Sequence, residues 1–321
     1  MQQRLADLSA DDHHRRLRRD GLHFRAGPFT LLVNSPIPQI EALIALFYAE
    51  YPLASGNDYR DFHLRVTHTS TLRRWIRPSA GFKGDGESPF TPMPARSSFP
   101  LFEWGLNWRV ATTAHQYLML HAAVVERDGV TVAMPALPGS GKSTLAAALM
   151  CRGWRLLSDE FGLVRPGTTA FVPFPRPIPL KNESIPLIAR FHPEAVIGPT
   201  FEGTRKGDVA HLKASAASIA RADEPAAITH VIFPRYQMGA EATFHAIEKA
   251  RAFMKVSSNS FNYQILGRDG FRTVAGLIEN SSCQSFIYSN LDDAIAAFDG
   301  LSSSGTSAYG AAPISAAASN S

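Results

Sequence analysis

The sequence predicts a mixed α/β fold, and two observations support this prediction. A strand pattern runs directly into a Gly-rich loop and then into a helix over residues 130–151. A second strand pattern lies just before it, so that residues 121–136 are expected to form an antiparallel hairpin in the same sheet. A sheet that contains both this hairpin and the strand-loop-helix unit is a mixed sheet, and we expect it to form the centre of the protein.

The first hundred residues predict a smaller α/β module. Alternating apolar side chains favour strands at Pro28–Asn34 and Phe62–Thr67, and Leu72–Ile76 is a candidate partner for the second strand. Apolar residues recur at helical spacing across Ile37–Tyr51. The Gly, Ser, Pro and Phe residues of Pro78–Pro100 predict a long loop or a connector to the next domain.

The rest of the chain predicts a larger domain. Phe102–Leu120 has the composition of an aromatic-rich helix, whose aromatic side chains we expect in the core. After the His121–Ala136 hairpin, the strong helix formers of Thr144–Cys151 predict a compact helix that ends at Gly153. The remaining elements are expected as strands at Arg155–Ser158, Phe161–Val164, Ala170–Val172, Ile228–Phe233 and Ser285–Ser289, and as helices at Ala240–Lys255 and Leu291–Phe298.

These elements divide the chain into three parts. Residues 1–110 are the N-terminal module with its connector, residues 111–300 are the larger domain, and residues 301–321 are a tail. The tail consists mainly of Ser, Ala and Gly, and we expect it to be disordered because it has too little apolar bulk to fold. Within the larger domain, the proline-rich segment Phe174–Pro177 is expected to be a rigid connector.

Composition and charge exclude several functional classes. The formal net charge is only +4, and the basic residues are scattered apart from a cluster at Arg15–Arg19, which argues against binding to nucleic acid. The two cysteines, Cys151 and Cys283, are far apart and form neither a disulfide framework nor a zinc motif. No apolar run reaches the length of a membrane helix, and residues 1–20 lack the apolar core of a signal peptide. We therefore expect a cytoplasmic protein that does not bind membranes.

The strongest functional signal is the loop that follows the hairpin. Gly141-Lys142-Ser143 matches the end of a Walker A motif and lies between a strand and a helix, as the motif requires. Small residues allow backbone N–H groups to surround phosphate oxygens, and the helix N-terminus adds a positive dipole. Ala136 stands where the motif has its first glycine. The residues expected to bind a nucleoside triphosphate are Pro138, Gly139, Ser140, Gly141, Lys142, Ser143 and Thr144.

Two adjacent acids, Asp159 and Glu160, follow closely behind this loop. They end a short predicted strand only 17 residues after Lys142, so the intervening helix must return the chain directly to the phosphates. Carboxylates and the Ser143 hydroxyl are suitable ligands for Mg²⁺ beside phosphate groups. One of the acids can also accept the proton of an attacking hydroxyl.

The run from His121 through Gly139–Ser143 to Arg152–Glu160 resembles bacterial HPr kinase/phosphorylase. That family has a strand beginning with His, a Gly-rich Lys-Ser loop and a basic strand ending in two acids at similar spacings. The chain is more similar to the HPr-kinase-related proteins of the "kinase A" type, and lasso peptide kinases and, more distantly, phosphoenolpyruvate carboxykinase share this core. The additional segments that carry the closer resemblance are the N-terminal module, Asn107-Trp108, Lys181–Ser184 and Gly203–Gly207.

The resemblance implies a kinase core with a phosphate loop on a mixed sheet, which transfers the γ-phosphoryl group of ATP to a serine-type hydroxyl. It implies that Asp159 is the catalytic base, that Glu160 is a metal or proton-relay residue, and that His121 lies near the active site. The family's Glu-x-Arg-Gly segment, which carries a second metal-site acid, is not matched, and Glu183 is the candidate substitute. From the residues themselves, Arg205 is a further candidate, because neighbouring glycines allow its guanidinium to close over the transferred group.

The prediction is therefore an ATP- and Mg²⁺-dependent kinase that acts on a peptide or small protein. Two alternatives remain open at this point. In the first alternative, the acceptor is a small molecule such as free serine. In the second, the chain is a nucleotide-binding regulatory module that has lost catalysis. The typical HPr kinase is a hexamer, which also leaves a homo-oligomer open.

Overall fold

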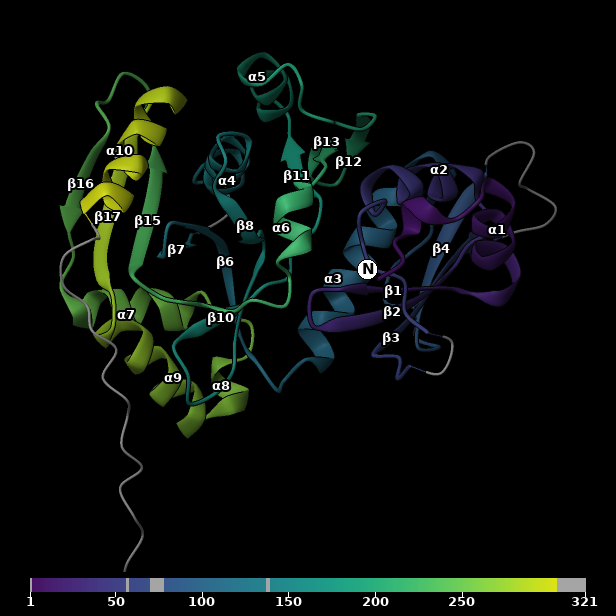
Figure 1. The fold of residues 1–321 in the computed structure, drawn as a ribbon, viewed down its shortest axis with the longest axis horizontal. Coiled ribbons are helices and arrows are strands. Elements are labelled where there is room, and N and C mark those ends of the chain that lie inside the picture. Colours follow the sequence, from purple (N-terminus) through teal and green to yellow (C-terminus); the bar gives the residue numbers. More distant parts are fainter. Residues whose placement is uncertain (1, 56–57, 70–77, 137–138, 305–321) are drawn as a thin grey trace, which may run out of the picture.

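The chain is a mixed α/β protein with three sheets (Figure 1). This computed structural model describes residues 2–55, 58–69, 78–136 and 139–304. A five-stranded sheet lies in the N-terminal part, a nine-stranded mixed sheet forms the centre of the C-terminal part, and a three-stranded sheet lies between them. None of the helices in the described ranges is both long enough and apolar enough to cross a membrane.

The N-terminal sheet has the strand order β1-β2-β3-β4-β5, and its bounds are β1 (Leu22–Ala26), β2 (Phe29–Asn34), β3 (Phe62–His68), β4 (Ser79–Gly84) and β5 (Met93–Pro94). Only the β2–β3 pair is parallel; the other pairs are antiparallel. Gly27 forms the tight turn between β1 and β2 with a positive φ of 54°. A Cβ atom at Gly27 would lie only 2.4 Å from the carbonyl oxygen of Pro173, so this turn packs directly against the C-terminal part.

Two helices cover this sheet. They are α2 (Pro38–Phe47) and α3 (Ser98–Thr113), and shorter helical segments lie at Leu5–Asp7, Ala10–Arg15 (α1), Arg16–Asp20 and Ala95–Ser97. The helix predicted over Ile37–Tyr51 is confirmed within narrower bounds. The aromatic helix predicted over Phe102–Leu120 begins earlier and ends at Thr113, because residues from Leu118 onwards belong to the central sheet.

The prediction of a loop or connector over Pro78–Pro100 was wrong. This stretch contains β4, β5 and the beginning of α3. Its Gly and Ser content is typical of loops, but Ala80 and Phe82 alternate with exposed residues and are buried against the core. Backbone pairing of β4 with β3 therefore outweighs the local composition. The candidate strand Leu72–Ile76 lies outside the described residues.

The central sheet has the order β14-β10-β9-β6-β7-β15-β17-β16, and β8 pairs with β6 beside this path. Its strands are β6 (Leu118–Arg127), β7 (Val130–Pro135), β8 (Arg155–Ser158), β9 (Phe161–Val164), β10 (Ala170–Val172), β14 (Ala226–Ala227), β15 (His230–Tyr236), β16 (Thr243–Ala246) and β17 (Ser282–Tyr288). Strands β7, β15 and β17 are parallel to one another, whereas the flanking pairs are antiparallel. The predicted mixed sheet is confirmed.

Helices cover both faces of the central sheet. On one face lie α4 (Lys142–Cys151) and α10 (Leu291–Ser304), and on the other lie α7 (Lys249–Ser258), α8 (Tyr263–Leu266) and α9 (Arg268–Glu279). Side chains of β15 alternate accordingly: Ile232 packs in the core cluster with α4 and α10, whereas Val231 and Phe233 pack in a second cluster with α7 and α9.

The β6–β7 hairpin is confirmed, and the residues of its turn explain where the chain reverses. Asp128 and Gly129 have φ values of 51° and 80°, as a two-residue turn with positive φ at both positions requires. The hairpin predicted over Phe161–Val164 and Ala170–Val172 is also confirmed as β9 and β10.

The helix predicted over Ala240–Lys255 was wrong in its first half. Thr243–Ala246 forms β16, the antiparallel edge strand beside β17, and the helix α7 begins only at Lys249. Phe244 packs against Phe286 of β17 with ring centroids 4.5 Å apart, so it is held by its neighbour in the sheet. Sheet pairing therefore outweighs the helical spacing of the apolar residues.

The third sheet has the order β11-β13-β12 and is entirely antiparallel. Its strands are β11 (Ile178–Lys181), β12 (Phe201–Thr204) and β13 (Gly207–Leu212), and the helices α5 (Ser184–Phe191) and α6 (Ala216–Ala220) accompany it. One buried cluster joins all parts of the protein and contains Leu64 of β3, Phe102 of α3 and Leu145 of α4. The N-terminal part is therefore packed firmly onto the C-terminal part.

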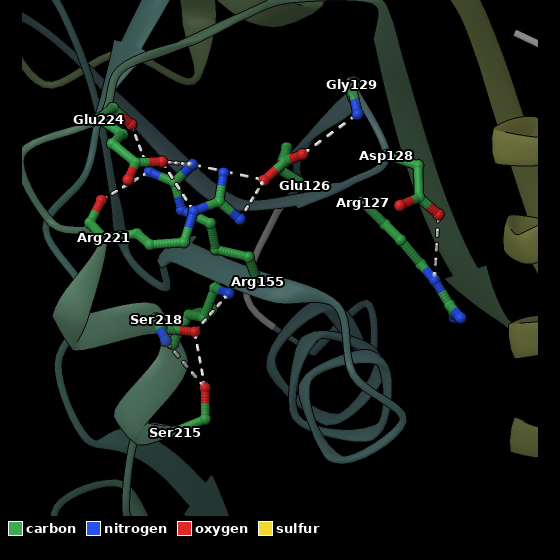
Figure 2. A network of polar contacts seen from close by, with 10 residues as sticks. Glu126, Arg127, Asp128, Gly129, Arg155, Ser215, Ser218, Arg221 and Glu224 are labelled. Atoms are coloured by element: carbon green, nitrogen blue, oxygen red, sulfur yellow. Dashed lines mark hydrogen bonds and ion pairs between the residues drawn. The ribbon is translucent and has the colours of Figure 1, made fainter. Parts of the chain in front are cut away.

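A buried ionic network holds β8 in place (Figure 2). Arg155 Nη1 lies 3.3 Å from Glu126 Oε2 of β6, and Arg155 Nη2 donates hydrogen bonds to the backbone oxygens of Arg221 and Glu224. The next residue of β8, Leu156, donates its N–H to Ser218 Oγ at 2.8 Å. Because β8 runs directly into Asp159 and Glu160, this network fixes the position of the two acids.

Replacing Arg155 by Leu should lower the free energy of unfolding by about 3 kcal/mol, because Glu126 would lose its buried partner and the backbone oxygens of Arg221 and Glu224 would lose their donor. Arg221 contacts the same Glu126 oxygen at 3.3 Å but is 46% exposed, and it provides the control. Arg221→Leu should cost less than about 1 kcal/mol, as exposed ion pairs usually do. Urea unfolding measures both, and equal losses in the two variants would contradict the structural role of Arg155.

Candidate active site

The Gly-rich loop turns sharply into the N-terminus of α4. Gly139 and Gly141 have φ values of 86° and 89°, a conformation that strongly favours glycine. A Cβ atom at Gly141 would also lie 2.6 Å from the hydroxyl of Tyr288. Gly141 caps α4, and the helix begins at Lys142, so Lys142 and Ser143 stand at its positive end. Pro138, predicted to bind phosphate, lies outside the described residues.

The loop lysine and the first acid face each other in a buried space. Lys142 Nζ lies 3.9 Å from Asp159 Oδ1, and the two side chains are only 7% and 1% exposed. That distance is too long for a hydrogen bond. Within the described chain, neither Lys142 Nζ nor either carboxylate oxygen of Asp159 has a hydrogen-bond partner. Buried polar groups are rarely left in this state, and a bound ligand is one of the explanations they call for.

Burial is the main influence on the Asp159 carboxyl, and it raises the pKa of this group above its usual value. The Lys142 ammonium and the nearby Ser143 hydroxyl, which lies outside hydrogen-bond geometry, oppose the rise, and the neighbouring Glu160 carboxylate adds to it. A carboxylate with a raised pKa is a stronger proton acceptor than an ordinary aspartate. Asp159 therefore has the electrostatic properties expected of a general base.

The second acid is held by side chains from other parts of the chain. Asn107 of α3 donates a hydrogen bond to Glu160 Oε2, and Arg176 donates to the Asn107 side-chain oxygen. Arg176 also donates to Glu103 at 3.0 Å, and the Tyr48 hydroxyl donates to the other oxygen of Glu103 at 2.6 Å. This chain of five side chains connects the N-terminal helices with the acid pair.

The conformation and the charge of Glu160 both indicate a specialised position. Its φ is 88°, which is rare for a residue other than glycine and costs backbone energy. Burial alone would raise the pKa of its carboxyl, but the positive charges of Arg176, Lys206, Lys142 and Lys181 outweigh burial and lower it. Glu160 is therefore negatively charged at neutral pH.

Two residues of this network carry no strong local signal in the sequence. Phe174–Pro177 was expected to be a rigid connector, yet Arg176 turns inward and is buried between Glu103 and Asn107. Glu103 lies among the aromatic residues of α3, which were expected to form only core. The weak signals available in the sequence are a charged residue between two prolines, Arg176, and a charged residue within an apolar helix, Glu103. Each of these charges needs a buried partner of opposite charge.

His121 lies on β6 close to the acids, as the resemblance implies. Burial and the positive charge of Lys142 lower the pKa of its imidazole to about 4, although Glu160 acts in the opposite direction. The ring lies edge-on to Phe261 with centroids 5.6 Å apart. At neutral pH His121 is therefore an uncharged neighbour of the site.

A narrow cavity opens beside Asp159 and Glu160. Its walls come from α3, from the proline segment and from the three-stranded sheet, and the lining residues are Glu103, Trp104, Asn107, Asp159, Glu160, Arg176, Pro177, Pro179, Lys181, Lys206, Val209 and His211. The ammonium of Lys206 lies 5.3 Å from the centroid of the Trp104 ring. We call this space the acid-pair cavity.

Two predicted site residues do not line the acid-pair cavity. Arg205 is exposed at the β12–β13 turn and donates to Thr91 Oγ1 at 3.3 Å. Its neighbour Lys206, and not Arg205 itself, lines the acid-pair cavity. Glu183 is exposed at the start of α5 and lines a different cavity. Roles for Arg205 and Glu183 in phosphoryl transfer or metal binding stay predictions.

This second, larger cavity lies next to the phosphate loop. It has a volume of about 660 Å³, within the usual range for small-molecule sites. Its lining residues are Gly139, Gly141, Thr144, Glu183, Ser184, Leu187, Arg190, Phe191, Tyr236, Tyr288, Ser289, Asn290, Leu291 and Asp292. We call it the loop cavity.

The side-chain oxygens near the Gly-rich loop suit a Mg²⁺ ion that is bound jointly by the protein and by phosphate groups. The described residues contain no group of three or more His, Cys, Asp or Glu side chains that could bind a metal without other ligands. Mg²⁺ is usually bound by one or two carboxylates, with substrate phosphates and water as the other ligands. Ser143, Asp159 and Glu160 fit that pattern, and the buried, unpartnered oxygens of Asp159 are suitable ligands.

Comparison with known proteins leaves this geometry as the main guide to function. No protein-family model matches the chain, and no curated protein matches it significantly.

Replacing Asn107 by Ala should release Glu160 and weaken divalent-metal binding by about tenfold or more, as the loss of an outer-shell hydrogen bond to a metal ligand does. Titration of Mn²⁺ in the presence of ADP, followed by electron paramagnetic resonance, measures this affinity. Thr112→Ala is the control, because Thr112 lies on the same helix but is exposed, and its hydroxyl donates only to the backbone oxygens of Trp108 and Arg109. An unchanged Mn²⁺ affinity in Asn107→Ala would show that Asn107 does not position Glu160.

Proposed function

We propose that this protein is an ATP- and Mg²⁺-dependent kinase related to the HPr-kinase-like group, which phosphorylates a serine-type hydroxyl. The observation that carries the proposal is the buried pair of Lys142 and Asp159, 3.9 Å apart and without hydrogen-bond partners in the described structure, at the end of a Gly-rich loop. A phosphate-binding lysine and a carboxylate base must stand this close to act on the same phosphoryl group.

The loop and helix α4 supply the binding of the triphosphate. Backbone N–H groups between Gly139 and Lys142 and the positive end of α4 favour phosphate oxygens, and the Lys142 ammonium neutralises charge on the β- and γ-phosphates. Ser143, Asp159 and Glu160 would hold Mg²⁺, which supplies further neutralisation of charge on the phosphates.

Asp159 would then act on the acceptor. Its carboxylate accepts the proton of the hydroxyl as the hydroxyl oxygen forms a bond to the γ-phosphorus. The bond between the γ-phosphorus and the bridging oxygen breaks, and its electron pair leaves with ADP. The buried position of both groups strengthens every charge interaction in the site.

The loop cavity supports a nucleotide as the ligand. Its volume of about 660 Å³ is enough for a nucleoside beside the phosphate loop, and aromatic side chains line it. Tyr236 is half-exposed, and its backbone N–H bonds to Ser140 of the loop at 3.2 Å, so its ring is held next to the phosphate site. A base can stack on this ring while the phosphates reach Lys142.

Asp159→Asn should reduce phosphoryl transfer by about 10²-fold or more while the affinity for metal-free ADP is retained, because the variant loses the proton acceptor and a charged Mg²⁺ ligand but keeps the loop and Lys142. Lys142→Ala should weaken both transfer and ADP binding. Transfer is followed with γ-labelled ATP and a matched cell extract, and binding by calorimetry. Asp128→Asn is the control, since Asp128 is exposed in a turn that tolerates Asn. Substantial transfer by Asp159→Asn would refute its role as the base.

Tyr236→Ala should raise the dissociation constant for ADP by about tenfold, which corresponds to the loss of one stacked base. The affinity for inorganic tripolyphosphate should not change, because this ligand has no base. Tyr59→Ala, at a residue that is 83% exposed in the N-terminal part, controls for nonspecific effects. Equal losses for ADP and tripolyphosphate would place the base elsewhere.

A further inference from the structure

We propose that the acceptor carries an anionic group, a carboxylate or a phosphate, close to its reacting hydroxyl, and that Lys181 and Lys206 bind this group in the acid-pair cavity. The inference rests on the proposed kinase function and adds the chemical class of the acceptor. It also assigns a role to two lysines that the binding of ATP does not require.

The arrangement of the two cavities indicates where the acceptor binds. The loop cavity contains Gly139, Gly141 and Thr144, whereas the acid-pair cavity contains Asp159 and Glu160, and the described residues that line one do not line the other. The attacking and leaving oxygens of a phosphoryl transfer lie on opposite sides of the phosphorus. A nucleotide bound at the loop therefore leaves the acid-pair cavity as the side from which the acceptor attacks.

The charges in the acid-pair cavity indicate what the acceptor carries. Glu103 is paired with Arg176, and Glu160 accepts a hydrogen bond from Asn107. By contrast, Lys181 and Lys206 form no ion pair with any carboxylate of the described chain, although both line the cavity. Both ammonium groups act on Glu160 only from beyond ion-pair distance, so each can still form a close contact with a ligand of negative charge.

The buried Asp159 indicates where the reacting hydroxyl of the acceptor would lie in this cavity. Its side chain is 1% exposed, and both of its oxygens lack hydrogen-bond partners in the described structure. Asp159 lines the same cavity as the two lysines. An acceptor with a hydroxyl near its anionic group would place the hydroxyl at Asp159 and the charge at Lys181 and Lys206.

The size of the cavity limits the acceptor and requires a movement. In the present conformation its volume is about 10 Å³, so there is room for little more than one water molecule. Lys206 lies on the β12–β13 turn, next to Gly207, and its ammonium lies 5.3 Å from the centroid of the Trp104 ring. We expect this turn to move outwards to admit the acceptor and then to return Lys206 to its anionic group. An enclosed site of this kind favours a small hydroxylated anion over a peptide.

The test uses the full chain saturated with Mg²⁺ and the non-hydrolysable ATP analogue AMP-PNP, so that the phosphate loop is already filled. Inorganic phosphate, glycerate and the neutral analogue glycerol are then titrated and followed by calorimetry. We expect saturable binding of phosphate and glycerate but not of glycerol. Lys181→Met and Lys206→Met should each weaken anion binding by about tenfold, the effect of losing one charged hydrogen bond, and Lys206→Arg should largely retain it.

Lys83→Met is the matched control, because Lys83 is exposed on β4 and does not line the cavity. The proposal is overturned if neither anion binds to the AMP-PNP complex, or if the Lys181 and Lys206 variants bind anions as tightly as the wild type. It is also overturned if a serine peptide without acidic residues binds the complex far more tightly than both small anions. A failure of AMP-PNP itself to bind would be seen before any anion is added, and would refute the nucleotide function instead.

Discussion

The proposed chemistry of this protein depends on one buried electrostatic contact, in which the Lys142 ammonium faces the Asp159 carboxylate. The two charges are removed from water, so each would be costly without a partner. They lie 3.9 Å apart, close enough to attract but too far apart for a hydrogen bond. Under the proposed function, a phosphate group with a divalent cation would satisfy both at once.

The rest of the structure holds the two groups in place. The β6–β7 hairpin and α4 present the lysine, while β8, fixed by the buried Arg155 network, returns the chain to the same point and presents the acids. The N-terminal part contributes directly, because Asn107 of α3 holds Glu160 and Glu103 holds Arg176. The site is therefore built from both parts of the chain, which accounts for their shared hydrophobic core.

Features encoded by local sequence could be predicted, whereas those created by long-range pairing could not. The hairpin, the loop and α4 follow from the Asp128-Gly129 turn and the glycines before Lys142, all of which lie within a few residues of the element they specify. The position of Asp159 beside Lys142 follows from the short distance between them in the sequence. Arg176 and Asn107 meet only in the folded chain, 69 residues apart in sequence, and β16 exists only because β17 lies beside it.

A crystal structure of the protein with Mg²⁺ and AMP-PNP tests the central claim most directly. The account predicts the γ-phosphate between Lys142 and Asp159, with the lysine ammonium on a phosphate oxygen and Mg²⁺ bound by an Asp159 oxygen. The base should lie in the cavity beside Tyr236. A nucleotide bound away from the loop, or an Asp159 carboxylate that reaches neither the γ-phosphate nor its metal, would contradict the account.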